Sequence, residues 1–189
     1  MSRPIYIAIM LLCASISGCG QAEKTQSPAN PPVQTDDTTG ATGLVIRQKN
    51  FTQEEASDTT FHFLKQSPPY FIATLENGNP RLRPTDTVTL FGGRIWFHIG
   101  KQKGSYTQLQ QHPQVEIVAY NVSREWIRIS GKAVFSDSPE VHEAALQANP
   151  VLKKLYNADT GADFASFHIR EAQVEIESKT KGNCRFRME

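Results

Sequence analysis

From residue 44 onward the chain alternates short runs of β-branched and aromatic residues with Gly, Pro and Asn. These runs predict strands at 70–75, 81–90, 94–98, 115–120, 126–135, 164–169 and 173–177. Within 126–135, Trp, Arg, Ser and Lys alternate with Ile, Ile and Val, which is typical of a strand with one buried face. Asn77-Gly78 and Gly92-Gly93 predict tight turns between the first three strands. Consecutive hairpins of this kind favour an antiparallel sheet.

Helices are expected at the margins of this sheet. Thr52 and Glu55 have the spacing of a capping box, and the helix that they begin must stop before Pro68-Pro69. Shorter helices are expected at 106–111 and after the pairs Ser138-Pro139 and Asn149-Pro150, because proline is favoured at the first helical position. The pattern predicts a mainly β (α+β) fold, an antiparallel barrel with peripheral helices.

The N-terminal residues predict export. Arg3 precedes an apolar run at 5–16 that is too short to span a membrane, which takes about 20 residues. Ile16-Ser17-Gly18-Cys19 follows, and it resembles the lipobox of bacterial lipoproteins. We therefore predict a signal peptide at 1–18 and lipidation of Cys19, whose acyl chains would hold the protein on a membrane. A buried N-terminal helix and ordinary secretion with cleavage nearby are the alternatives.

Residues 19–43 are predicted to be the lipidated Cys followed by a disordered tether. This segment is rich in Pro, Thr, Ser, Gln and Asp, and it has too few apolar residues to offset the entropy of ordering. Gly20 follows Cys19, where many lipoproteins retained in the inner membrane have Asp. We expect a lipid-anchored protein of the bacterial cell envelope, in the outer membrane and facing the periplasm.

Residues 44–189 are long enough for one domain with a real core. The formal net charge of +1 gives no reason to expect nucleic acid as a partner. Once Cys13 has left with the signal peptide and Cys19 is lipidated, Cys184 has no intrachain disulfide partner, and it is expected in a polar C-terminal tail. The five His residues lack metal-ligand spacing, so no metal site is predicted.

Several short motifs occur in a recognisable order. They are Phe71-Ile72-Ala73-Thr74, Pro80-Arg81-Leu82-Arg83-Pro84, Lys103 with Gln108, His112-Pro113-Gln114-Val115-Glu116-Ile117, Glu125-Trp126-Ile127-Arg128-Ile129-Ser130-Gly131 and Asn149-Pro150. This order resembles the pyridoxamine 5'-phosphate oxidase superfamily, in its general FMN-binding branch, over residues 53–178. The resemblance implies a six-stranded antiparallel split β-barrel that forms a homodimer, with two FMN molecules in grooves between the protomers.

Arg81 and Arg83 have suitable chemistry for the FMN phosphate, because guanidinium groups bind phosphate bidentately and residues two apart share a strand face. Pro84 removes a ladder donor and so predicts a sheet edge. The resemblance implies further contacts to the cofactor from Thr85, His98, Ile99, Lys103 and Gln108, and from Trp126 and Arg128 of the other subunit. The alternatives are a solvated strand face for the two Arg residues and a core or interface position for Trp126, as for Trp96.

The stretch 98–103 departs from the family, which often has Thr and Asn after this strand, whereas here Lys101 and Lys103 supply charge. The leading hypothesis is a lipid-anchored FMN-dependent oxidoreductase acting on a small-molecule substrate or electron acceptor, with no catalytic side chain assigned. The alternative is a non-catalytic envelope lipoprotein that binds a flavin or haem; a relative that binds a deazaflavin or no ligand is also compatible with the departure. Pyridoxamine 5'-phosphate oxidation itself is not expected, because only Arg185 and Arg187 remain of the C-terminal segment that grips that substrate.

Overall fold

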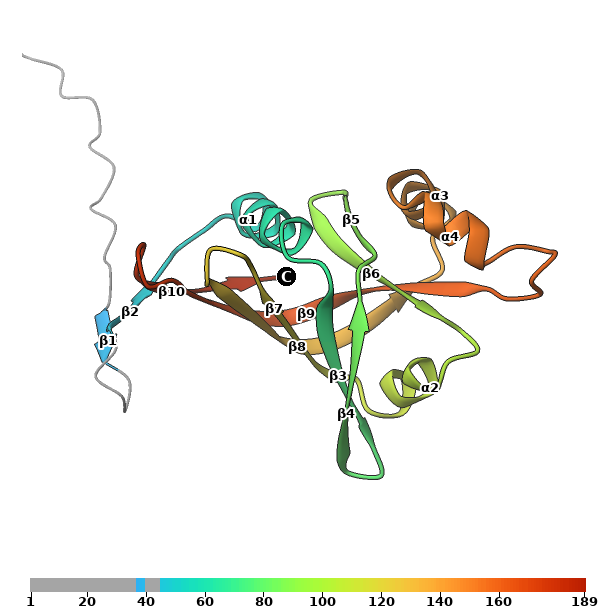
Figure 1. Cartoon of the computed structure of the whole chain (residues 1–189), viewed down its shortest axis with the longest axis horizontal. Coiled ribbons are helices and arrows are strands. Elements are labelled where there is room, and N and C mark those ends of the chain that lie inside the picture. Colours follow the sequence, from blue (N-terminus) through green and yellow to red (C-terminus); the bar gives the residue numbers. More distant parts are fainter. Residues whose placement is uncertain (1–36, 40–44) are drawn as a thin grey trace, which may run out of the picture. The chain divides into compact units, whose positions relative to one another are not determined.

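The computed structural model of the chain describes residues 37–39 and 45–189. The predicted signal peptide, Cys19 and all of the predicted tether except 37–39 lie outside this part. The strands are β1 (Asp37–Thr39), β2 (Val45–Gln48), β3 (Tyr70–Glu76), β4 (Asn79–Thr85), β5 (Val88–Phe91), β6 (Arg94–Gly100), β7 (Gln114–Tyr120), β8 (Trp126–Ser136), β9 (Phe164–Glu177) and β10 (Asn183–Met188) (Figure 1). The helices are α1 (Gln53–Lys65), α2 (Gly104–Gln111), α3 (Pro139–Ala148) and α4 (Pro150–Leu155). None of these helices is long and apolar enough to cross a membrane.

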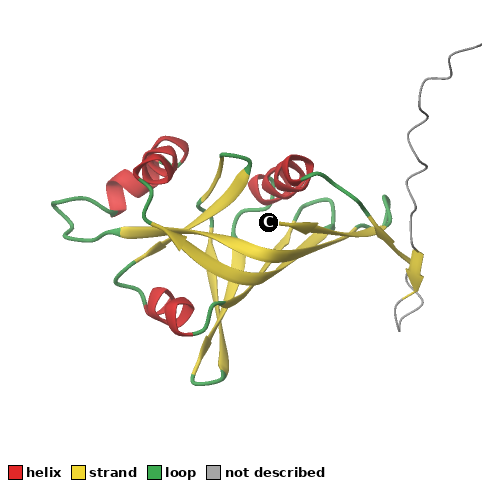
Figure 2. Cartoon of the chain, turned by 180° about the vertical axis from the view of Figure 1, so that it is seen from behind, coloured by secondary structure: helices red, strands yellow, loops and turns green. Residues whose placement is uncertain are grey.

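All of these strands join one sheet in the described part of the chain, in the order β1-β2-β10-β9-β8-β7-β3-β4. The β5–β6 hairpin is attached through β6, which pairs with the first residues of β9. Every pairing is antiparallel except that of β2 with β10. The helices lie around the curved sheet (Figure 2). The predicted α+β split-barrel fold is therefore confirmed, with β1, β2 and β10 as additional strands.

One face of the curved sheet forms the core. Ile117, Ile127, Ile129 and Val174 are fully buried there because they occupy the apolar positions of alternating strands. Burial of one such side chain contributes about 2 kcal/mol. Helix α1 adds its own buried residues to this core, and its N-terminus has the predicted capping box at Thr52. The alternation predicted for 126–135 is confirmed at Ile127 and Ile129 of β8, whereas the third buried position is Ala133 and Val134 is only partly buried.

Two strand predictions were wrong in their boundaries. The strand expected at 81–90 is divided at Asp86 and Thr87 into β4 and β5. The strands expected at 164–169 and 173–177 form one continuous strand, β9. The polar residues between the two expected strands form a β-bulge and do not end the strand. Opposite the bulge, Ser130 and Lys132 of β8 pair with Gln173 and Arg170, so that β9 carries one extra residue.

The prediction of a polar tail around Cys184 was also wrong. Residues 183–188 form β10, which pairs with β9 and β2. Phe186 and Met188 are buried in the core, while Arg185 and Arg187, which alternate with them, face the other way. Alternation over six residues was too short and too charged to be recognised as a strand. The edge position predicted from Pro84 is confirmed, since β4 ends the sheet and pairs only with β3.

Candidate functional site

A small cavity of about 60 Å³ lies where β4, the end of β6 and the start of α2 meet. Six of the ten cofactor-binding residues predicted from the sequence line it, namely Arg83, Pro84, Thr85, His98, Ile99 and Lys103. Ile72, Phe97 and Phe167 complete its apolar wall, and Ser105 of α2 adds a hydroxyl. The six predicted residues lie within 20 positions of one another, whereas Ile72 and Phe167 of the same cavity are 95 positions apart in the sequence.

Arg83 is held in place by neutral oxygens. Its guanidinium donates to Thr74 Oγ1 at 2.7 Å and to Gln108 Oε1 at 2.8 Å, and Thr74 Oγ1 itself donates to Gln108 Oε1 at 2.7 Å. A guanidinium has five N–H donors, so three remain after these two bonds. Since neither partner is a carboxylate, the positive charge of Arg83 is oriented without being neutralised by direct contact. Such a group suits an anionic ligand.

The N-terminus of α2 faces the same cavity. Lys103 is the N-cap residue and provides no side-chain cap, and Ser105, in the first turn, is buried. The first N–H groups of a helix have no intrahelical acceptor and carry a partial positive charge. Together with Lys103 and Arg83 they form an anion site of the type that binds phosphate. The residues present therefore fit the phosphate of FMN.

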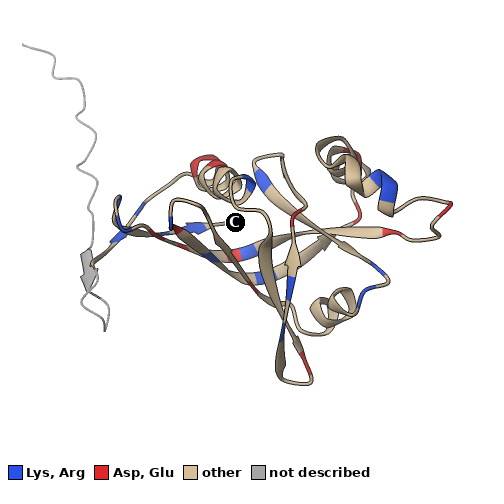
Figure 3. Ribbon diagram, viewed as in Figure 1, with Lys and Arg blue, Asp and Glu red and all other residues tan. Residues whose placement is uncertain are grey.

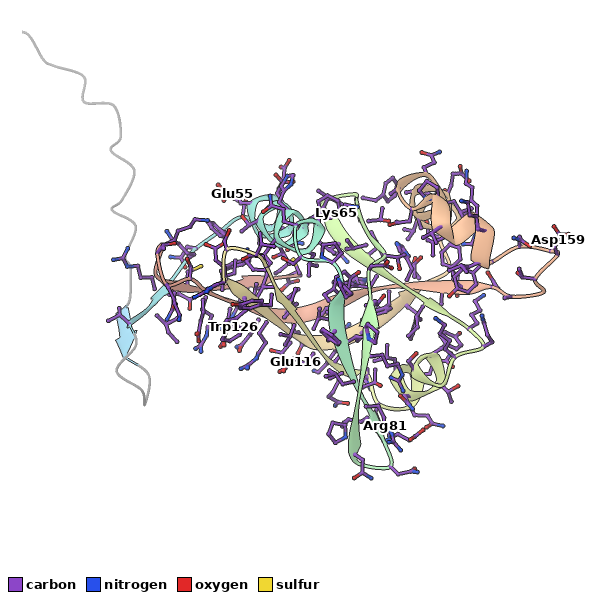
Figure 4. The ribbon with its side chains drawn as sticks, viewed as in Figure 1. Glu55, Lys65, Arg81, Glu116, Trp126 and Asp159 are labelled. Carbon is purple, nitrogen blue, oxygen red and sulfur yellow. The ribbon has the colours of Figure 1, made fainter. Side chains whose placement is uncertain are left out.

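Arg81 lies apart from this cavity. It is at the tip of the β3–β4 hairpin (Figure 4), where it forms an ion pair with Glu76 at 2.6 Å. Hydrogen bonds from Arg81 and Gln108 lower the pKa of Glu76. Gln108 in turn is buried and donates to Glu76 at 2.9 Å while it accepts from Arg83. Gln108 therefore acts as a positioning residue for Arg83 in this structure, and Arg81 is neutralised outside the cavity.

The side chain of His98 is enclosed in a hydrogen-bonded network. Nε2 lies 2.8 Å from Thr89 Oγ1, Nδ1 lies 2.9 Å from Ser166 Oγ, and Asn149 Nδ2 donates to Thr89 Oγ1 at 2.9 Å. Burial, followed by the nearby His142, lowers the pKa of His98 to about 4. The imidazole is therefore neutral at pH 7. Both ring nitrogens of His98 therefore have a hydroxyl partner, and Thr89 is itself held by the amide of Asn149.

This network decides what His98 can offer to a ligand. Phe97 and Ile99 point into the core, so that the side chain of His98, between them, lies on the other face of β6. With both ring nitrogens engaged, the imidazole has no free donor for the cavity. Thr89 and Ser166 were missed in the sequence because only the pairing of β6 with β5 and β9 brings them to His98.

Trp126 and Arg128 lie on the face of the sheet opposite to Arg83 and cannot reach the cavity of their own chain. Trp126 Nε1 donates to Glu177 Oε2 at 3.1 Å, and the guanidinium of Arg128 lies 5.1 Å from the centroid of the Trp126 ring. Arg128 also lies between Glu116 at 3.6 Å and Glu175 at 3.9 Å. Only a second copy could bring these two side chains to the cavity, and their assignment to it stays a prediction.

Other chemistry is sparse in the described part of the chain. No group of three His, Cys, Asp or Glu residues there could hold a metal ion. Cys184 is half-buried, and this burial raises the pKa of its thiol. A buried thiol with a raised pKa is a poor nucleophile.

Comparisons with known proteins give one consistent answer. The profile of the family described as Pyridoxamine 5'-phosphate oxidase matches residues 57–177. Among solved structures, a NimC/NimA family protein from Clostridium acetobutylicum is 32% identical, with a TM-score of 0.67, over 72% of this chain and 94% of that one. No curated protein sequence matches.

Two more distant structures share the fold. A haem-binding protein from Mycobacterium smegmatis is 16% identical with a TM-score of 0.55, over 72% of this chain and 58% of that one. A Clostridium acetobutylicum protein related to general stress protein 26 of B. subtilis, of the pyridoxinephosphate oxidase family, is 14% identical with a TM-score of 0.50, over 72% and 96%.

Proposed function

The chain belongs to the pyridoxamine 5'-phosphate oxidase family, and on this premise we propose that its domain binds FMN and is an oxidoreductase for a small-molecule substrate or electron acceptor. The observation that carries the proposal is the un-neutralised guanidinium of Arg83, which faces the same cavity as Lys103 and the N-terminus of α2. These three groups would hold the phosphate of the flavin. Charge-assisted hydrogen bonds of this kind are about twice as strong as neutral ones.

The remaining cavity residues would bind the part of FMN next to the phosphate. Pro84, Thr85, His98 and Ile99 all line this part of the cavity. The apolar wall excludes water there, which strengthens every polar contact to the cofactor. Bound FMN would supply electron or hydride transfer, and the protein would supply binding, orientation and electrostatics. We assign no proton-transferring side chain, since the neutral imidazole of His98 is engaged elsewhere.

We also propose a homodimer, because one chain encloses too little space for the cofactor. Sites for ligands of this size usually measure about 300–1,000 Å³, whereas the cavity measures about 60 Å³. The outer face of β3 and β4 exposes Phe71 and Leu82, which are 42% and 66% exposed. A second copy covering this face would bury them and bring its Trp126 and Arg128 toward the flavin.

We further propose that the protein is anchored in the bacterial cell envelope through lipidated Cys19, in the outer membrane facing the periplasm. The lipobox Ile16-Ser17-Gly18-Cys19 supports this proposal. Metabolic labelling with a radioactive fatty acid tests it: the native chain is expected to incorporate label and a Cys19→Ala variant is not. Labelling of neither chain would refute the anchor without bearing on the flavin.

The flavin is tested by the visible spectrum of the purified mature protein and by titration with FMN and with riboflavin, which lacks the phosphate. We expect FMN to bind more tightly than riboflavin. Removal of one charged contact costs about 2 kcal/mol, or about 30-fold in affinity. Arg83→Ala and Lys103→Ala should therefore weaken FMN binding and leave riboflavin binding nearly unchanged.

Arg47→Ala is the matched control, because it removes an exposed cation on β2, far from the cavity. It should leave both affinities unchanged. A colourless protein that ignores added FMN would refute the proposal. A Soret band in the protein as purified would replace FMN with haem, the alternative that the fold of the Mycobacterium smegmatis protein keeps open.

A further inference from the structure

One end of the sheet gathers segments that are far apart in the sequence. Tyr120, at the end of β7, pairs with Trp126 at the start of β8, and Trp126 pairs with Glu177 at the end of β9. Asn183, at the start of β10, pairs with Ile46 near the start of β2. The β7–β8 turn, the β9–β10 turn and the first residues of β2 therefore lie at the same end. In Figure 4 the labelled Trp126 and Asp159 lie toward opposite ends of the domain.

This end exposes apolar side chains beside basic ones, and the carboxylate of Glu177, which accepts from Trp126, lines the same hollow. Val122 in the β7–β8 turn is 99% exposed, Tyr120 is 60% exposed, and Val45 is 49% exposed. Arg124 and Lys179 lie beside them and line a hollow of about 510 Å³ together with Val45. Figure 3 shows Lys and Arg at the end where β2 and β10 lie. We name the set Val45, Tyr120, Val122, Arg124 and Lys179 the basic tip.

The two turns of the basic tip are fixed to each other by Glu125. This buried carboxylate accepts hydrogen bonds from Asn121 at 3.0 Å and Ser178 at 2.9 Å, and it forms an ion pair with Lys181 at 3.0 Å. These contacts, Asn121 first, lower the pKa of Glu125 to about 2. Glu125 is thus paired with Lys181. Arg124 and Lys179 form no ion pair with any residue in the described part of the chain.

We propose that the basic tip rests on the surface of a bilayer that contains anionic lipids, with Val122 and Tyr120 at headgroup level and Arg124 and Lys179 at the headgroup phosphates. The proposal rests on the anchor proposed above. The first described residues after Cys19 are those of β1, and Thr39 at its end pairs with Val45 of the tip, so the chain reaches the domain beside the tip. Exposed apolar and aromatic residues flanked by basic side chains are the combination that binds membrane interfaces.

Docking at this end has a clear geometric consequence. Phe167 lines the flavin cavity and Glu177 lies at the tip, ten positions further along β9. At about 3.3 Å per residue the two are separated by roughly 30 Å along the strand. The cavity would therefore open into the aqueous space rather than onto the bilayer, where a water-soluble substrate could reach it.

The test uses the mature lipidated protein in vesicles of phosphatidylethanolamine with or without the anionic lipid phosphatidylglycerol. In a Cys184→Ser background, Val122→Cys carries an environment-sensitive fluorophore at the tip. Asp159→Cys, in the turn at the opposite end, is the matched label position. We expect a shift to shorter emission wavelength at position 122, larger with the anionic lipid, and no shift at position 159.

Replacing Arg124 and Lys179 together with Ala should reduce the ratio of docked to undocked protein about 25-fold, because each basic side chain near an anionic surface contributes about fivefold to this ratio. Lys153→Ala with Lys154→Ala, which removes two exposed cations from α4, is the charge-matched control and should leave it unchanged. A chain that floats with the vesicles while the label at 122 stays in water would overturn the basic tip alone. A chain that does not float would overturn the anchor and the tip together, and the visible spectrum decides the flavin separately.

Discussion

The buried His98 makes the stability of the domain depend on pH. In the unfolded chain its pKa is the ordinary 6.5, whereas burial lowers the pKa of His98 to about 4 in the fold. Between these values the unfolded state binds a proton that the folded state does not, so the free energy of unfolding decreases as the pH falls below 6.5. The full effect is about 3 kcal/mol, reached below pH 4 or so, and about 2 kcal/mol is lost between about pH 7 and pH 5.

Urea denaturation of the native chain and of His98→Gln over this pH range measures the effect. The Gln side chain of the variant is polar but does not titrate. All other titrating residues are the same in both proteins, so their contributions cancel when the free energy of unfolding of the variant is subtracted from that of the native chain. At neutral pH the variant should be about 1–2 kcal/mol less stable, because the hydroxyl of Ser166 loses its partner. The difference should shrink toward pH 5 and then change sign. A difference that stays constant with pH would refute the reasoning.

Three further substitutions test other parts of the structure. Gly131→Ala would place its Cβ 2.7 Å from the carbonyl oxygen of Arg170, and the resulting overpacking should destabilise the domain by about 1–3 kcal/mol in urea denaturation; an unchanged midpoint would show that the bulge can relax. Thr52→Ala removes the cap of α1 and should cost about 1 kcal/mol, measured in the same way; a negligible loss would mean that solvent replaces the cap. Leu82→Asp should convert the proposed dimer to a monomer in analytical ultracentrifugation, with Lys154→Asp on the exposed side of α4 as the control; a dimer that persists in Leu82→Asp would place the interface elsewhere.

Most of the sheet could be predicted from the sequence because its strands follow local rules. The alternation in β8 and the turn at Asn77-Gly78 are both properties of a few consecutive residues. The split between β4 and β5, the bulge in β9 and the strand β10 could not be predicted this way. Each of these features depends on a partner strand. For example, β10 is a strand because it pairs with β9 and with β2, and β2 is more than 130 residues away in the sequence.

The candidate site likewise has parts that could be predicted from the sequence and parts that could not. Arg83 and Lys103 could be proposed from residue type and order, and the fold brings them to one cavity. The neutralisation of Arg81 by Glu76 depends on the hairpin register, and the enclosure of His98 depends on three separate segments. Sequence order therefore indicated which residues lie near the site, while their hydrogen-bond partners decide which of them has a free donor for a ligand.

The edge strand β4 carries Pro80 and Pro84, and this spacing has a consequence for self-association by strand addition. Proline has no backbone N–H. The backbone N–H groups of β4 that donate to β3 must therefore come from the residues that alternate with Pro80 and Pro84, including Arg81 and Arg83. The row that points away from β3 comprises positions 80, 82 and 84, and only Leu82 retains a donor there. An extended chain arriving at this edge finds one N–H where an ordinary strand would offer three. The open end of the sheet is thus a poor template for amyloid-like growth, even at the high local concentrations of a crowded surface.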